Sequence, residues 1–123
     1  MKNILETDDD IKNLFECLSK EARKAPMKGC MGRSRRLAYI FRARGHNARF
    51  LEITHKIALD WETTFGSSIK SRFASEPWAF HYAVEVNRVV YDPNLGYPID
   101  RKGYVNAAYT NRSSSVKIVR GKY

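Results

Sequence analysis

This 123-residue sequence has no long apolar run, only two cysteines and only three histidines. Without an apolar stretch of roughly 20 residues, no membrane-spanning helix is expected, and the first residues lack the features of a signal peptide. Cys17 and Cys30 are too few for the disulfide framework of a small extracellular domain, so we expect free thiols. The few histidines and cysteines have no ligand-type spacing, and no glycine-rich phosphate loop is present. We therefore expect no metal and no cofactor.

Acidic residues are scarce after residue 21. Residues 1–21 contain six Asp and Glu against three Lys, whereas residues 22–123 contain 19 Lys and Arg against seven Asp and Glu, a net charge of +12. A basic excess of this size favours an acidic partner, such as RNA, an acidic protein surface or an inhibitor protein that masks the site. Solubility is the alternative explanation.

The spacing of apolar residues predicts a single α+β domain over residues 1–123, with N-terminal helices packed on a small antiparallel sheet. Helices are predicted at 8–24 and 30–44, with Gly45 as the C-cap of the second. β-Rich runs predict strands at 48–54, 80–86, 89–92 and 115–120, the middle two forming a tight hairpin around Asn87-Arg88. Between the first two strands, a short helix is indicated by the spacing of Ile57, Ala58, Trp61 and Phe65. Residues 99–114 are polar and mixed, and no element is predicted there.

Cys30 stands at the start of the second predicted helix, directly after Gly29. A helix N-terminus lowers the pKa of a thiol, and its free backbone N–H groups are candidate donors to an oxyanion. Glycine lets the backbone turn tightly and lets a substrate approach. Cys30 is therefore the candidate nucleophile. Cys17 instead borders the apolar stripe of the first helix and is expected to be a buried structural thiol.

His81 and Asp92 lie on opposite arms of the predicted hairpin. A short turn near residues 86–88 places the two positions opposite or nearly opposite each other. One imidazole nitrogen then donates to the carboxylate while the other faces Cys30, which is the arrangement of a thiol nucleophile, a base and an orienting acid. Each residue alone has an ordinary structural explanation, and their joint order in the sequence favours catalysis.

Two segments resemble the papain-like and transglutaminase-like cysteine enzymes. GCMGRSRRLAYIFRARGHNAR (29–49) is similar to their nucleophile helix and following turn, and FHYAVEVNRVVYDPNLG (80–96) to their histidine strand and the strand after it. The closest resemblance is to papain-fold toxin domains of bacterial polymorphic and contact-dependent toxins, which include protein-glutamine deamidases. It implies a papain-like fold with Cys30 as nucleophile, His81 as base and Asp92 as orienting acid. It also implies action in the cytoplasm of a target cell, as part of a larger secreted bacterial protein with an acidic immunity protein.

The sequence departs from that family in one respect, because it contains no glutamine, and papain-like proteases often use a glutamine as oxyanion donor. A backbone N–H, Asn47 or Trp78 remains as a candidate donor. Arg33 is a further candidate contact to substrate. It belongs to a set of arginines that is interpreted either as a dock for an acidic substrate or RNA backbone, or as a solvated helix face. The set comprises Arg33, Arg35, Arg36, Arg42, Arg44 and Arg49.

Three functions follow from these observations. The first is a cysteine hydrolase or acyltransferase acting on a carboxamide, in its most specific form a toxin that deamidates a glutamine of a target protein. The second is an RNase, such as one that cleaves tRNA, in which His81 is the general base for a ribose 2′-OH. The third is a non-catalytic binding module, for which Cys30→Ala changes nothing.

Overall fold

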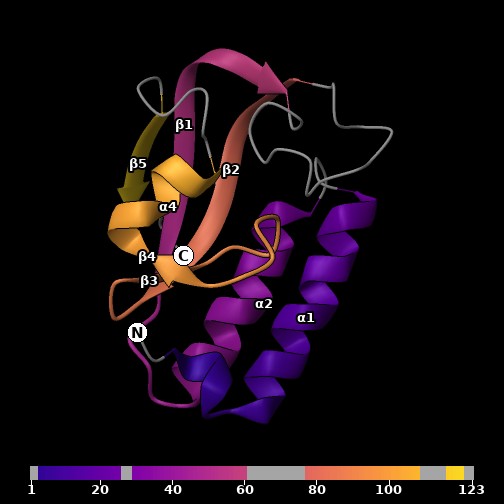
Figure 1. The fold of residues 1–123 in the computed structure, drawn as a ribbon, viewed down its shortest axis with the longest axis vertical. Coiled ribbons are helices and arrows are strands. Elements are labelled where there is room, and N and C mark those ends of the chain that lie inside the picture. Colours follow the sequence, from indigo (N-terminus) through magenta and orange to yellow (C-terminus); the bar gives the residue numbers. More distant parts are fainter. Residues whose placement is uncertain (1–2, 26–28, 61–76, 109–115, 121–123) are drawn as a thin grey trace.

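The computed structural model describes residues 3–25, 29–60, 77–108 and 116–120, in which helices cover a five-stranded antiparallel sheet (Figure 1). The elements in chain order are η1 (Ile4–Glu6), α1 (Asp9–Lys24), α2 (Cys30–Ala43), β1 (Arg49–Asp60), β2 (Pro77–Val86), β3 (Val89–Tyr91), β4 (Ile99–Asp100), α4 (Arg101–Ala108) and β5 (Val116–Arg120). The strands are ordered β4-β3-β2-β1-β5, and all neighbours are antiparallel. The predicted α+β class is thus confirmed. None of the described helices has the length and apolar character needed to cross a membrane.

Local hydrogen bonds fix the start of α1 and the end of α2. The side chain of Asp8 accepts hydrogen bonds from the backbone N–H groups of Asp10 and Ile11, which caps α1. After α2, Gly45 adopts φ +82° and donates to the carbonyl of Arg42, while His46 donates to that of Phe41. This pair of bonds is a Schellman motif, so the predicted role of Gly45 is confirmed.

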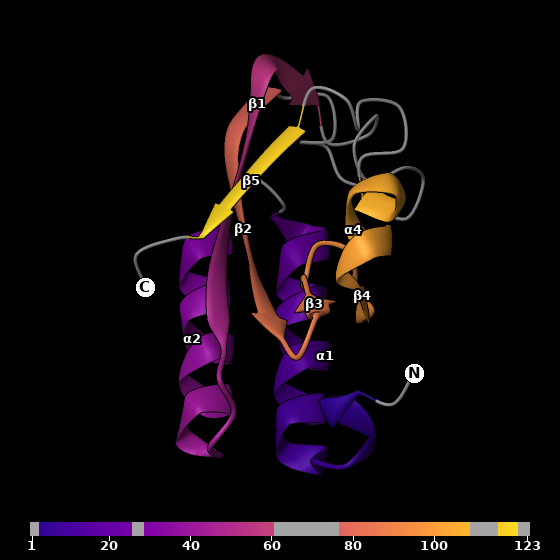
Figure 2. The same ribbon diagram turned by 90° about the vertical axis from the view of Figure 1, so that its left-hand side faces the viewer.

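The sheet separates two apolar cores. The first core consists of eleven buried residues and lies between the sheet and the helices α1 and α2. The second lies between the sheet and α4, which contributes the buried side chains of Tyr104 and Ala108. Figure 2 shows α2 and α4 on opposite sides of the molecule. Cys17 lies on the outer side of α1 and is exposed, so the expectation of a buried thiol is wrong. The buried face of α1 is therefore narrower than the sequence suggested and does not include Cys17.

Long-range pairing changes two predictions. Strand β1 continues to Asp60, because Leu59 and Asp60 still pair with the first residues of β2. Ile57 and Ala58 are therefore strand residues, and the short helix predicted for them is wrong; Trp61 and Phe65 lie outside the described residues. In the segment without a predicted element, the chain forms β4 and α4.

Candidate active site

The first turn of α2 places Cys30 next to strand β2. Gly29 precedes the helix with φ +81°, and its carbonyl accepts the N–H of Arg33 at 2.8 Å, which closes the first helical turn. One turn after Cys30, the buried Ser34 donates its hydroxyl to the carbonyl of Tyr82 at 3.0 Å. Because Tyr82 follows His81 directly, this bond holds the helix terminus beside the histidine.

The hairpin between β2 and β3 brings Asp92 to His81 along a diagonal. Asn87 and Arg88 form the two-residue turn with φ of 51° and 65°, the left-handed pair of a type I′ turn. Continuing the observed register past the end of β3 sets Asp92 against Ala83, two residues from His81. Residues two apart on a strand share a face, so the offset leaves both side chains on the same side of the hairpin. The predicted near-opposite placement holds, with that offset.

His81 and Asp92 form a fully buried hydrogen-bonded couple. Nε2 of His81 lies 2.8 Å from Oδ2 of Asp92, and both side chains have 0% exposure. The carboxylate also accepts the hydroxyl of Tyr104 at 2.6 Å on Oδ2 and the backbone N–H of Asn94 at 2.9 Å on Oδ1. Three donors therefore fix the carboxylate and, through it, the plane of the imidazole.

The Cys30 thiol lies beside the same imidazole, and each group shifts the pKa of the other. Since Nε2 is turned to Asp92, Nδ1 is the ring nitrogen on the side of the thiol. Strand β3 ends at Tyr91, so the described part of β2 that carries His81 is paired with β1 on one side only. The sulfur, imidazole and carboxylate thus meet in a line near this unpaired edge.

The electrostatics of the site favour an imidazolium and a thiolate. Burial lowers the pKa of His81, but the charge and hydrogen bond of Asp92, together with Cys30, outweigh burial and raise this pKa to about 9. Burial raises the pKa of the Cys30 thiol, but its interactions with His81 and the positive charge of Arg33 outweigh burial, and the pKa is lowered. Opposite shifts in touching groups are the pattern of an ion-paired nucleophile.

Arg33 is the third charged group at this helix terminus. It lies on the inner face of α2, only 5% exposed, and its Nη2 donates to Oδ1 of Asn94 at 3.4 Å. Burial lowers the pKa of its guanidinium, whereas the charges of Cys30 and Asp92 act in the opposite direction. Arg33 thereby connects α2 to the loop that carries Asp92.

Sequence reasoning missed Tyr104 and Asn94, which complete the surroundings of Asp92. Asn94 belongs to the Asp-Pro-Asn sequence, where an aspartate typically accepts the N–H two residues later, so a local signal for it existed. Tyr104 comes from α4, an element that was not predicted, and its contact to Asp92 spans twelve positions. No local pattern indicates that contact.

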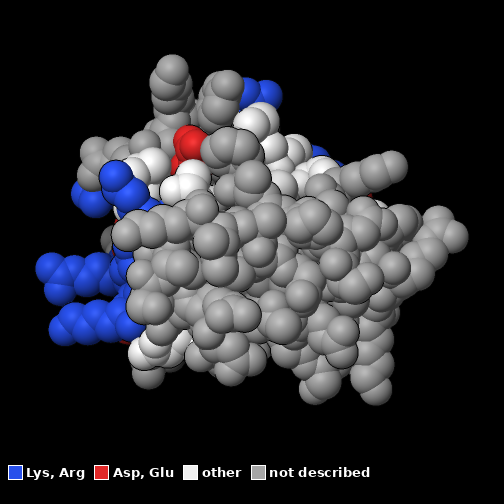
Figure 3. Space-filling view, turned by 90° about the horizontal axis from the view of Figure 1, so that it is seen from above, with Lys and Arg blue, Asp and Glu red and all other residues white. Residues whose placement is uncertain are grey.

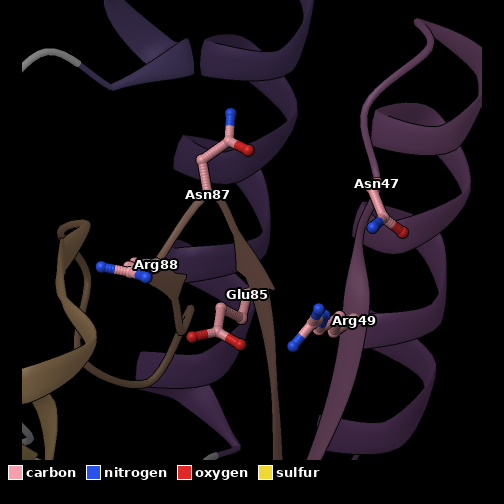
Figure 4. Close-up of a pocket in the computed structure, with 5 residues that line it drawn as sticks. All are labelled: Asn47, Arg49, Glu85, Asn87 and Arg88. Atoms are coloured by element: carbon pink, nitrogen blue, oxygen red, sulfur yellow. The ribbon is translucent and has the colours of Figure 1, made fainter.

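The structure does not bring Asn47 to the proposed nucleophile. Cys30 begins α2 and Asn47 follows its end, and a helix of 14 residues spans roughly 20 Å. Asn47 instead lines a separate cavity of about 310 Å³, together with Arg49, Glu85, Asn87 and Arg88 (Figure 4). Asn47 is therefore too far from Cys30 to be the oxyanion donor that the sequence suggested. Trp78 belongs to β2, but its side chain lies outside the described residues.

The arginines of α2 and β1 do not form one cluster around Cys30. Only Arg33 faces the site, whereas Arg36 pairs with Glu21 on the surface at 3.4 Å. Arg44, at the far end of α2, pairs with Asp8 and Asp10 at 2.8 Å each. The residues are close in sequence, but the length and turn of the helix distribute them over different faces and ends.

The opposite pKa shifts predict an unusual pH profile for the thiol. In a Cys17→Ala background, alkylation of Cys30 by chloroacetamide should reach half its maximal rate clearly below the ordinary thiol pKa of 9.0. The same protein unfolded in guanidinium should titrate near that value. His81→Ala should move the midpoint upward, because burial remains while the imidazolium is lost. Any step that needs the imidazolium should slow as pH rises through about 9. An unchanged midpoint in His81→Ala would contradict the proposed ion pair.

Two glycines give a matched test of the space near Cys30. Gly29 and Gly45 have φ of +81° and +82°, but a Cβ on Gly29 would lie 3.1 Å from Nη1 of Arg33, whereas one on Gly45 would contact nothing within 4 Å. Alanine at either site should cost about 1–2 kcal/mol of stability from backbone strain. Only Gly29→Ala should also slow alkylation of Cys30. Thermal unfolding and alkylation kinetics check both, and equal alkylation rates in the two variants would refute the prediction.

Comparisons with protein-family models, curated proteins and solved structures return no match to this chain.

Proposed function

We propose that this protein is a cysteine-dependent amidohydrolase or acyltransferase of papain-like architecture, with Cys30 as nucleophile, His81 as acid and base, and Asp92 as the orienting carboxylate. The observation that carries the proposal is the buried line in which a thiol at a helix N-terminus touches an imidazole held 2.8 Å from a carboxylate. Three further contacts support it, since Tyr104 and Asn94 donate to Asp92 and Ser34 donates to the carbonyl of Tyr82, the residue after His81.

The residues supply each proton that amide hydrolysis needs. The Cys30 thiolate attacks the carbonyl carbon of a carboxamide, the new C–S bond forms, and the carbonyl electron pair moves to oxygen. The adduct collapses as the C–N bond breaks, and the nitrogen takes the proton of the His81 imidazolium and leaves as ammonia. Neutral His81 then takes a proton from water, whose oxygen displaces Sγ to give a carboxylic acid. Thiolate and imidazolium are thereby restored.

A glutamine side chain of a target protein is the substrate that we propose, and a bacterial toxin or effector is the biological setting. Two observations support this substrate and setting. The segments around Cys30 and His81 resemble papain-fold toxin domains, and residues 22–123 carry a net charge of +12. Seen from above, lysine and arginine side chains project at the left of the view and others stand at its far edge (Figure 3). A basic excess of this size favours docking of an acidic target or an acidic immunity protein.

The experiment compares wild type and Cys30→Ala expressed in bacterial cells, with peptide mass spectrometry of the proteome and tRNA analysis on the same samples. Deamidation adds about one dalton to a glutamine, because –NH2 becomes –OH. Wild type should create such peptides with intact tRNA, and Cys30→Ala should create none. Peptides that are cleaved, or whose glutamine is linked to an amine, would still support Cys30 as the nucleophile. They would show that the reaction is proteolysis or cross-linking and not deamidation. Cleaved tRNA would reject amide chemistry as the main activity.

The state of His81 disfavours the RNA-cleaving alternative. A general base for a ribose 2′-OH has to be neutral, whereas Asp92 and Cys30 raise the pKa of His81 to about 9, so the ring is mainly protonated at pH 7. The basic charge remains the support for that alternative, and the tRNA arm of the experiment tests it.

A further inference from the structure

Arg33 is difficult to explain by folding alone. Its side chain is 95% removed from solvent, and Nε, itself buried, has no hydrogen-bond partner among the described residues. Its closest polar contact is a long one, 3.4 Å from Nη2 to the neutral amide oxygen of Asn94. Burying a guanidinium is unfavourable unless a carboxylate or another anion satisfies it, and no described carboxylate forms a hydrogen bond with Arg33. The guanidinium therefore keeps one donor, Nε–H, that no described residue accepts.

The guanidinium that carries this donor lies next to the residue that precedes the nucleophile. Nη1 lies 3.1 Å from the position that a Cβ on Gly29 would occupy, so the guanidinium fills the side-chain space of the residue that precedes the nucleophile. Its charge acts on both Cys30 and Asp92. Cys30, Gly29 and Arg33 thus form one turn, in which a cation lies beside the sulfur at the positive end of a helix.

We propose that Arg33 is the anion-stabilising residue of this site, holding first the Cys30 thiolate and then the oxygen of the tetrahedral adduct. This inference rests on the proposed acyl transfer at Cys30. As the S–C bond forms, negative charge leaves Sγ and develops on the former carbonyl oxygen, while the guanidinium stays in place. An N–H of the guanidinium then donates to that oxygen, which supplies the donor that the missing glutamine would otherwise provide.

Two small electrophiles separate this role from general activation of the thiol. Chloroacetamide alkylates a thiolate without forming an oxyanion, whereas p-nitrophenyl acetate acylates it through a tetrahedral adduct that carries one. The variants are Arg33→Met and Arg33→Lys in a Cys17→Ala background, because slow alkylation of the exposed Cys17 would otherwise add a background rate. Arg36→Met is the matched control, since Arg36 is exposed on the same helix. Rates are compared at a pH where Cys30 is fully ionised in every variant.

Arg33→Met should slow acylation by roughly 100-fold and alkylation by much less, because only acylation passes through an oxyanion. Arg33→Lys, which keeps the charge but loses the planar donor set, should fall between wild type and Arg33→Met. Arg36→Met should match wild type in both reactions. Equal losses in the two reactions would overturn the oxyanion role and leave Arg33 as a thiolate partner only.

The outcome is readable even if Arg33→Met does not fold. Thermal unfolding identifies that case, and the test then depends on Arg33→Lys. If Arg33→Lys acylates and alkylates at the same rates as wild type, the proposal is overturned. A merely structural role predicts a lower melting temperature with unchanged ratios of acylation to alkylation. Because neither probe is the biological substrate, a selective loss of acylation alongside unmodified cellular glutamines would reject the proposed substrate and leave this inference standing.

Discussion

Cys30→Ala should reduce acyl transfer from p-nitrophenyl acetate by at least roughly 1,000-fold, to the level of the unfolded chain or below. The reason is that no other described nucleophile is activated by a touching imidazole; Cys17 is exposed and contacts Glu21 only at 4.0 Å. Cys30 is only partly buried, so alanine removes little packing and the melting temperature should change little. Burst kinetics and the intact mass of the acetylated protein provide the measurement.

The matched control is Cys17→Ala, which should keep the burst amplitude and the acetylated mass of wild type. Cys30→Ser should be nearly as inactive as Cys30→Ala, because a hydroxyl is a much poorer nucleophile than a thiolate at neutral pH. Acetylation that persists in Cys30→Ala but disappears in Cys17→Ala would place the reactive thiol elsewhere and remove the basis of the proposed function.

Asp92→Asn should reduce the same acyl transfer by roughly 10²- to 10⁴-fold, the range seen when an orienting carboxylate becomes an amide. A neutral amide no longer stabilises the imidazolium, so the pKa of His81 should fall and that of the Cys30 thiol should rise. The loss should be largest near pH 7 and smaller at high pH, where the thiol ionises without help. The measurement is the pH profile of acylation and of chloroacetamide alkylation.

Stability separates the catalytic from the structural contribution of Asp92. Asp92→Ala should cost about 3–5 kcal/mol, because it leaves the hydroxyl of Tyr104 and the N–H of Asn94 buried without their acceptor. Asp92→Asn keeps an acceptor oxygen and should cost less. Asp100→Asn is the exposed control, and it should alter neither activity nor stability by much. If Asp92→Asn retained the alkylation midpoint of wild type, the carboxylate would not be orienting or charging His81.

Local sequence was sufficient for the elements whose boundaries are set by nearby residues. The cap of Asp8 and the Schellman motif at Gly45 delimit the helices, and the turn at Asn87-Arg88 sets the hairpin. Hydrogen bonds over two to five positions decide these features, so a short window contains the necessary information. The pairing of His81 with Asp92 followed from that hairpin, because both residues lie within one short-range structure.

What the sequence by itself determined about this protein is therefore its α+β class, its two long helices and the hairpin that joins an imidazole to a carboxylate. Tertiary structure alone decided that β1 extends to Asp60, that α4 delivers Tyr104 to Asp92, and that Arg33 turns inward whereas Asn47 lies at the far end of α2. These outcomes depend on contacts between residues far apart in the chain. Such contacts outweigh local preference once strands pair and helices pack against both faces of the sheet.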